Sequence, residues 1–128
     1  MTNVLLDTCA ILWLASGDRR LTERAKAAIV AAPVAFVPAV SGFEIALKHR
    51  QGKLELPATP ERWLETIVAH HGLTVLDLTL ADAIRAPQLP DVHRDPCDRF
   101  IIAAALRLDI PIITADPRFQ DYGVTVIG

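Results

Sequence analysis

The chain has 128 residues, of which 52% are hydrophobic, so it is long enough for one globular domain (residues 1–128) and too apolar to be disordered. Its formal net charge is −2, without the basic excess that nucleic-acid-binding proteins usually carry. Two cysteines are too few for a disulfide framework, which favours a reducing, cytoplasmic setting, and we expect neither a signal peptide nor a membrane span.

Short apolar runs alternate with segments that read as helices. In chain order we expect a strand at 3–6, a helix that begins at Asp7–Thr8, a helix at 22–31, a strand at 34–37, helices at 41–51 and 59–72, a strand at 73–76, a helix from Thr79, a loop at 87–94, a helix at 95–108, a strand at 111–114, a turn at 116–117 and a strand at 124–127. The runs lack strict polar alternation, which is typical of strands covered on both faces. The pattern therefore predicts an α/β fold with a central, mainly parallel sheet of four to five strands flanked by helices.

Four acidic residues stand where such a fold places ligand-binding groups. Asp7 and Asp116 follow predicted strands, and ligands of open α/β sheets bind beyond the carboxyl ends of the strands. Glu44 and Asp98 stand in the first turns of predicted helices that can face the same crevice. Carboxylates crowded into one pocket either retain protons or attract cations, and Mg²⁺ and Mn²⁺ prefer such oxygens. Metal ions held in this way can bind a phosphodiester without a serine or histidine nucleophile.

Each acid also has a purely structural interpretation. Asp95, before Pro96, is expected to be a plain N-cap, and Asp98 can complement the dipole of the same helix. Asp116 can start a turn, and Glu44 completes a capping-box pattern with the serine three positions before it. From the residues alone, the sequence indicates an α/β domain with a possible acidic site.

Four segments, in order along nearly the whole chain, resemble the PIN-domain ribonucleases, and among them the VapC-type toxins of prokaryotic toxin–antitoxin pairs. The segments are NVLLDTCAILW at 3–13, PAVSGFEIALKHRQGK at 38–53, HRDPCDRFIIAAA at 93–105 and IITADPRF at 112–119. The resemblance implies a PIN fold and an Mg²⁺- or Mn²⁺-dependent endoribonuclease. It assigns both catalysis and metal binding to Asp7, Glu44, Asp98 and Asp116, which we call the four site acids.

The same resemblance implies partners and supporting residues. Thr114 matches a hydroxyl near the site of the family, Thr8 matches the residue after the first acid, and we count Asp95 as a further possible supporting residue. Members of the family cleave RNA, usually form homodimers, and are inhibited by a small antitoxin protein that often covers the acidic pocket. We expect the same partners here, and no membrane.

Several residues near these motifs are expected to be structural. Cys9 and Cys97 depart from the common family pattern and are interpreted as small packing residues. His93 is interpreted as a solvated loop histidine rather than a ligand of substrate phosphate. Trp13 is expected to pack in the core, although Trp13 and Trp63 could also line a groove for a partner.

Four competing functions remain to be compared. A phosphoaspartate phosphatase would need a second aspartate where Cys9 stands, and a receiver domain would need a late lysine, whereas no lysine follows Lys53. A PIN-like domain that only binds a partner would not need all four acids. A structure-specific DNA nuclease would need a helical arch, for which 128 residues leave little room.

Overall fold

A computed structural model describes residues 2–128 and shows one five-stranded sheet, parallel throughout, with strand order β3-β2-β1-β4-β5. The strands are β1 (Val4–Leu6), β2 (Ala35–Pro38), β3 (Thr74–Leu76), β4 (Ile112–Ile113) and β5 (Val126–Ile127). The predicted α/β class and the five predicted strands are thus confirmed.

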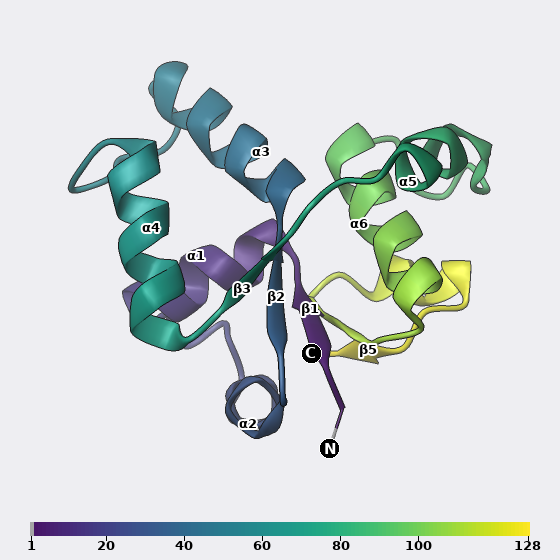
Figure 1. The fold of residues 1–128 in the computed structure, drawn as a ribbon, viewed down its shortest axis with the longest axis horizontal. Coiled ribbons are helices and arrows are strands. Elements are labelled where there is room, and N and C mark those ends of the chain that lie inside the picture. Colours follow the sequence, from purple (N-terminus) through teal and green to yellow (C-terminus); the bar gives the residue numbers. More distant parts are fainter. Residues whose placement is uncertain (1) are drawn as a thin grey trace.

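Helices cover both faces of the sheet (Figure 1). They are α1 (Thr8–Ser16), α2 (Glu23–Ala31), α3 (Ala39–Arg50), α4 (Pro60–His71), α5 (Leu80–Arg85) and α6 (Pro96–Leu108), with short 3₁₀ helices η1 (Ala86–Gln88) and η2 (Pro117–Tyr122). Val4 and Leu6 of β1 pack with α1, α2 and α4, whereas Leu5 packs with α6 and η2. Two apolar cores therefore lie on opposite faces of the sheet, as the apolar strands require.

Local side-chain chemistry explains most helix boundaries. Thr59 accepts the N–H of Arg62 at the start of α4, Pro60 occupies the first helical position, and Gly72 ends the helix with a φ of 63°. Asp95 caps α6 by accepting the N–H of Cys97 at 2.9 Å, as predicted. These boundaries are readable from sequence because each depends on neighbours within three residues.

The predicted start of the third helix is wrong. Helix α3 begins at Ala39, and its N-cap, Pro38, makes no side-chain capping bond. Ser41 lies inside the helix, is fully buried, and shares a hydrogen bond of 2.8 Å with the hydroxyl of Thr8. The capping box between Ser41 and Glu44 therefore does not form, and Glu44 lies in the second turn. In addition, the predicted loop at 87–94 begins within η1, and the turn at 116–117 continues as η2.

The strand order places one crevice at the centre of the sheet. From β1 the chain adds β2 and β3 on one side and later β4 and β5 on the other. The two directions diverge between β1 and β4, and ligands of such sheets bind beyond the carboxyl ends of the strands at this point. Within residues 2–128, no helix has both the length and the apolar character needed to cross a membrane.

Candidate metal centre

Asp7 follows β1 directly and is 7% exposed. Its Oδ1 accepts the N–H of Ala10 at 2.8 Å, so it caps α1, while its own N–H donates to the carbonyl of Ile113 in β4. Burial raises the pKa of Asp7 above its ordinary value, and the nearby charges of Glu44 and Asp116 raise it further. Hydrogen bonds from Thr114 and Ala10 oppose this rise. Asp7 is therefore both a helix cap and a buried acid surrounded by other acids.

Two threonines link the strand ends to the acids. The hydroxyl of Thr114 accepts the N–H of Asp116 at 3.1 Å and hydrogen-bonds the carboxyl group of Asp7. Thr8 bonds instead to Ser41, which ties the start of α1 to the start of the helix that carries Glu44. Thr114 thus supports two acids directly, and Thr8 supports the site through the packing of two helices.

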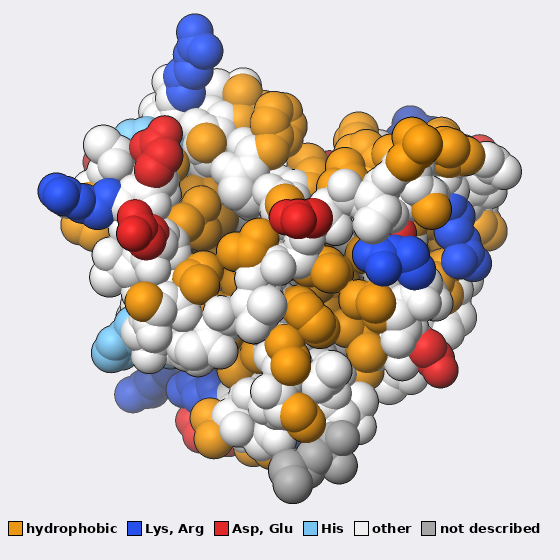
Figure 2. Space-filling view, viewed as in Figure 1, with side chains coloured by type: hydrophobic (Ala, Val, Ile, Leu, Met, Phe, Trp, Pro, Cys, Tyr) orange, Lys and Arg blue, Asp and Glu red, His pale blue; other side chains and the backbone are white. Residues whose placement is uncertain are grey.

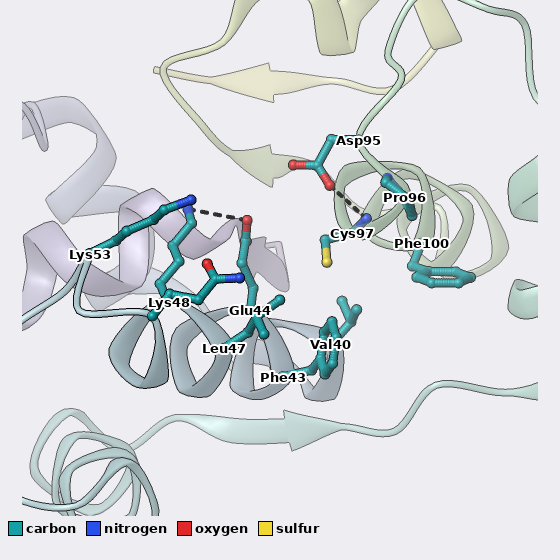
Figure 3. Close-up of a pocket in the computed structure, with 11 residues that line it drawn as sticks. Val40, Phe43, Glu44, Leu47, Lys48, Lys53, Asp95, Pro96, Cys97 and Phe100 are labelled. Atoms are coloured by element: carbon teal, nitrogen blue, oxygen red, sulfur yellow. Dashed lines mark hydrogen bonds and ion pairs between the residues drawn. The ribbon is translucent and has the colours of Figure 1, made fainter.

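Glu44 faces the start of α6 across a cleft of about 370 Å³ (Figure 3). Potential ligand atoms of Glu44, Asp95 and Cys97 lie within 4.8 Å of one another, and residues 2–128 contain no other such group of three. Lys48 Nζ lies 3.4 Å from Glu44 Oε2, so one acid has a local counter-charge. Asp95 therefore faces Glu44 as well as capping its helix. Among the four site acids, all of which the structure describes, no three have ligand atoms that all lie this close together.

Asp98, in the first turn of α6, is a site acid whose pKa is strongly shifted. Burial, followed by the charges of the acids around it, raises its pKa from 3.8 to about 7. The contributing acids, in decreasing order of effect, are Asp95, Glu44, Asp7 and Asp116. Because the charge of each of them contributes to the raised pKa of Asp98, the predicted acids share one electrostatic neighbourhood.

Asp116 is the acid with the most hydrogen-bond partners. Its Oδ1 accepts the backbone N–H and the Nε–H of Arg118, and its Oδ2 accepts the Nη2–H of Arg118 at 3.0 Å. His93 Nε2 lies 2.9 Å from the same Oδ2. The bonds from Arg118 hold the pKa of Asp116 below its ordinary value. This fourth acid is thus engaged by protein groups on both oxygens.

The interpretation of His93 as a solvated residue is wrong. Its ring is buried, and Nδ1 lies 3.5 Å from Asp98 Oδ2 while Nε2 contacts Asp116. Sequence reasoning missed this because the contact to Asp116 spans 23 positions, and missed Arg118 because an arginine beside Asp116 has no distinctive pattern. A useful signal was available for His93, which begins the same segment as Asp98.

The remaining predictions have mixed outcomes. Cys97 is buried, as expected of a packing residue, and burial raises the pKa of its thiol to about 11, which disfavours the thiolate. Cys9 is exposed, whereas its neighbours Ala10 and Ile11 are buried in the core, so the interpretation of Cys9 as a packing residue is wrong. Trp13 packs partly against the core, and with Trp63 it also lines a groove of about 410 Å³.

The donor chemistry of the site fits a hard divalent cation. Burial, followed by the charges of neighbouring carboxylates, raises the pKa of Asp7 and of Asp98, so the site has an unmet demand for positive charge, and carboxylate oxygens are the ligands that Mg²⁺ and Mn²⁺ prefer. The protonated thiol of Cys97 adds little for such ions.

Comparison with known proteins gives consistent matches along the chain. The sequence model of the family described as PIN domain matches residues 4–124. The chain is 32% identical to Ribonuclease VapC22 of Mycobacterium tuberculosis over 123 residues, which are 95% of this chain and 93% of that protein.

Solved structures share the fold. A structure of VapBC2 from Rickettsia felis, bound to a DNA fragment from the promoter, contains a chain with a TM-score of 0.71 at 10% identity, covering 98% of this chain and 97% of that chain. The VapC20 toxin of Mycobacterium tuberculosis, described as cleaving the sarcin-ricin loop, gives 0.62 at 19% identity, covering 95% and 96%.

Proposed function

The chain belongs to the PIN-domain family, and on this basis we propose that it is a divalent-metal-dependent endoribonuclease that acts as the toxin of a toxin–antitoxin pair. One observation carries the proposal: acids from separate segments lie near one another where the strand order diverges, and there burial and the charges of its acidic neighbours raise the pKa of Asp98 to about 7. The relative named as a ribonuclease supports RNA as the substrate.

We assign catalysis and metal binding to the four site acids. Asp7, Glu44 and Asp98 would hold Mg²⁺ or Mn²⁺, and Asp116 would complete the set from a position already fixed by Arg118 and His93. When bound, the metal supplies positive charge to the phosphodiester and activates water for hydrolysis. Thr114 keeps two of the acids oriented, and the burial of Asp7 limits competing contact with water.

Positive side chains beside the acids suit the backbone of RNA. Lys48 and Lys53 border the cleft between α3 and α6 (Figure 3). Arg118 is largely exposed beside Asp116. These groups can contact phosphates although the whole chain carries a net charge of −2. The charges that matter are therefore local.

The surface offers apolar regions for both proposed protein partners. The groove with Trp13 and Trp63 is suited to an antitoxin segment, and the guanidinium of Arg20 lies 5.0 Å from the centre of the Trp13 ring. Hydrophobic side chains also border a hollow between α3 and the α5–α6 end (Figure 2). Phe43 of α3 and Leu80 and Ile84 of α5 are exposed hydrophobic side chains of these elements. We propose that this region contacts a second copy of the chain in a homodimer. We also propose that residues 1–128 form a single domain and that the protein acts in the cytoplasm.

A cleavage assay tests the proposal. The purified protein should cleave RNA with Mg²⁺ or Mn²⁺ and stop when EDTA is added, because the acids alone cannot neutralise the phosphate. Asp7→Asn, prepared in parallel, controls for contaminating nucleases and should be inactive. Cleavage that persists in EDTA, or equally in Asp7→Asn, would exclude the mechanism. A folded protein that binds the metal but never cleaves RNA would favour the partner-binding alternative.

A further inference from the structure

We propose that His93 is a positioning residue, which bridges Asp98 and Asp116 and holds these two carboxylates in place for a metal ion. The inference rests on the proposed metal site and adds to it a residue that is not itself a ligand. Three features carry it: the geometry of the bridge, the way the loop of His93 is anchored, and the origin of those anchors.

The imidazole joins the two acids directly. It is 4% exposed, with Nε2 at 2.9 Å from Asp116 Oδ2 and Nδ1 at 3.5 Å from Asp98 Oδ2. The edge of the ring packs against Phe119, with the ring centres 5.0 Å apart and the planes at 88°. Both nitrogens therefore face carboxylates, while a buried aromatic neighbour fixes the plane of the ring.

The loop that carries His93 is held by Arg99, the residue after Asp98. The buried guanidinium of Arg99 donates to the carbonyl oxygens of Ala86, Pro90 and His93 at 2.8 to 3.0 Å, and also to that of Leu89. An arginine with this many carbonyl partners specifies the path of the loop, because its planar fork loses these bonds if the loop shifts.

A second anchor comes from the segment after Asp116. The N–H of His93 donates to the hydroxyl of Tyr122 in η2, and Phe119 belongs to the same helix. Helix α6, which carries Asp98, and η2, which directly follows Asp116, thus hold the histidine from two sides. A displacement of either acid would have to break contacts of His93.

This arrangement has a consequence for metal binding. Two like charges next to each other repel, and a bridge between them fixes their separation before a cation arrives. Partners that orient metal ligands are worth roughly 10- to 100-fold in metal affinity. If His93 were merely a satisfied core residue, its loss would reduce stability and leave the metal affinity of the folded protein unchanged.

Mn²⁺ binding to the intact chain separates the two roles. The variants are His93→Leu, which removes both contacts, and His93→Gln, whose amide can still donate to Asp116. Ile101→Val is the matched control, since it removes a buried methylene of α6 that packs in the apolar core and carries no polar group. Affinity is measured by the paramagnetic resonance of free Mn²⁺, and melting temperature is measured on the same samples.

We expect His93→Leu to weaken Mn²⁺ binding by about tenfold or more, His93→Gln, which keeps only the contact to Asp116, to lose less affinity than His93→Leu, and Ile101→Val to lose stability only. Wild-type affinity in His93→Leu would overturn the proposal, as would equal losses in the Leu and Gln variants. If His93→Leu does not fold, His93→Asn replaces it, because its shorter amide cannot reach Asp116. Equal affinity in the Asn and Gln variants would then overturn the bridge. Failure of the wild-type protein to bind Mn²⁺ would instead reject the metal site itself.

Discussion

At the scale of single residues, the site acids differ in how far other protein groups already occupy them. Both carboxylate oxygens of Asp116 are contacted by Arg118 or His93. The pKa of Asp98, in contrast, is raised by burial and by the charges of its acidic neighbours. This difference separates the acid with the strongest demand for a cation from the acid whose demand is largely met. The amide variants of the acids should therefore be unequal.

The first prediction concerns cleavage rates of these variants. We expect Asp7→Asn, Glu44→Gln and Asp98→Asn to lose about 100-fold or more in the rate of RNA cleavage, because each removes charge from the metal site. Asp116→Asn should lose less, since its amide oxygen can still accept from Arg118. Initial rates on one RNA at saturating Mg²⁺ measure this series.

Asp95→Asn is the internal control for that series. Asparagine still caps α6, so we expect activity within a few-fold of wild type. The group formed by Asp95, Glu44 and Cys97 makes this a sharp comparison. Inactive Asp95→Asn together with active Asp98→Asn would mean that Asp95 is the ligand at this helix start.

The second prediction concerns pH in the absence of metal. Because the pKa of Asp98 is about 7 in the folded state and near 3.8 in the unfolded chain, the folded protein holds the proton more tightly. Stability should therefore fall as pH rises from about 4 to above 7, and the raised pKa of Asp7 acts in the same direction. In EDTA, the melting temperature should decrease between pH 5 and pH 8, and less so in Asp98→Asn. An identical slope in both proteins would contradict the assignment of this pKa to Asp98.

At the scale of elements, hydrogen bonds between helices set the position of Glu44. The bond between Thr8 and Ser41 joins two buried hydroxyls from α1 and α3. Removing one partner leaves the other buried without its bond, which costs about 1–3 kcal/mol.

The third prediction follows from that bond. Thr8→Val should lower the free energy of unfolding by about 2 kcal/mol, and the double variant with Ser41→Ala should cost less than the sum of the single changes. Urea unfolding of the four proteins in the cycle measures this coupling. Strictly additive losses would show that the two hydroxyls do not support each other.

The accuracy of the sequence predictions follows the range of the interactions involved. The start of α4 depends on Thr59, Pro60 and close neighbours, and it was predictable. The start of α3 was not, because Ser41 bonds across the fold to Thr8 instead of capping its own helix. His93 was misjudged for the same reason, since its partners lie on α6 and before η2.

At the scale of the whole molecule, the alternation of strands and helices predicted a parallel sheet, and the apolar runs predicted its burial. The pairing of β1 with β4 was not predictable from periodicity, because it joins segments separated by most of the chain. That pairing brings Asp7 next to Thr114 and Asp116. The resemblance indicated which acids belong together, and the strand order explains how they meet.

The central claim is that these acids form a cation site, which makes stability depend on metal. An ion that binds only the folded state, and is present at a concentration of 100 times its Kd, adds about 2.7 kcal/mol to the free energy of unfolding. For a domain of this size this raises Tm by roughly 10 °C. Asp7→Asn keeps the cap of α1 but loses the charge, and Asp18→Asn, on an exposed ion pair away from the strand ends, is the control.

The decisive measurement is the melting temperature of wild type, Asp7→Asn and Asp18→Asn, each with and without Mg²⁺. Without metal, Asp7→Asn should melt at or above the wild-type temperature, because neutralising one acid relieves repulsion. With Mg²⁺, wild type and Asp18→Asn should gain stability by the same amount, and Asp7→Asn should gain much less. Equal Mg²⁺-dependent shifts in wild type and Asp7→Asn would contradict the account, because Asp7 would then not contribute to a metal site.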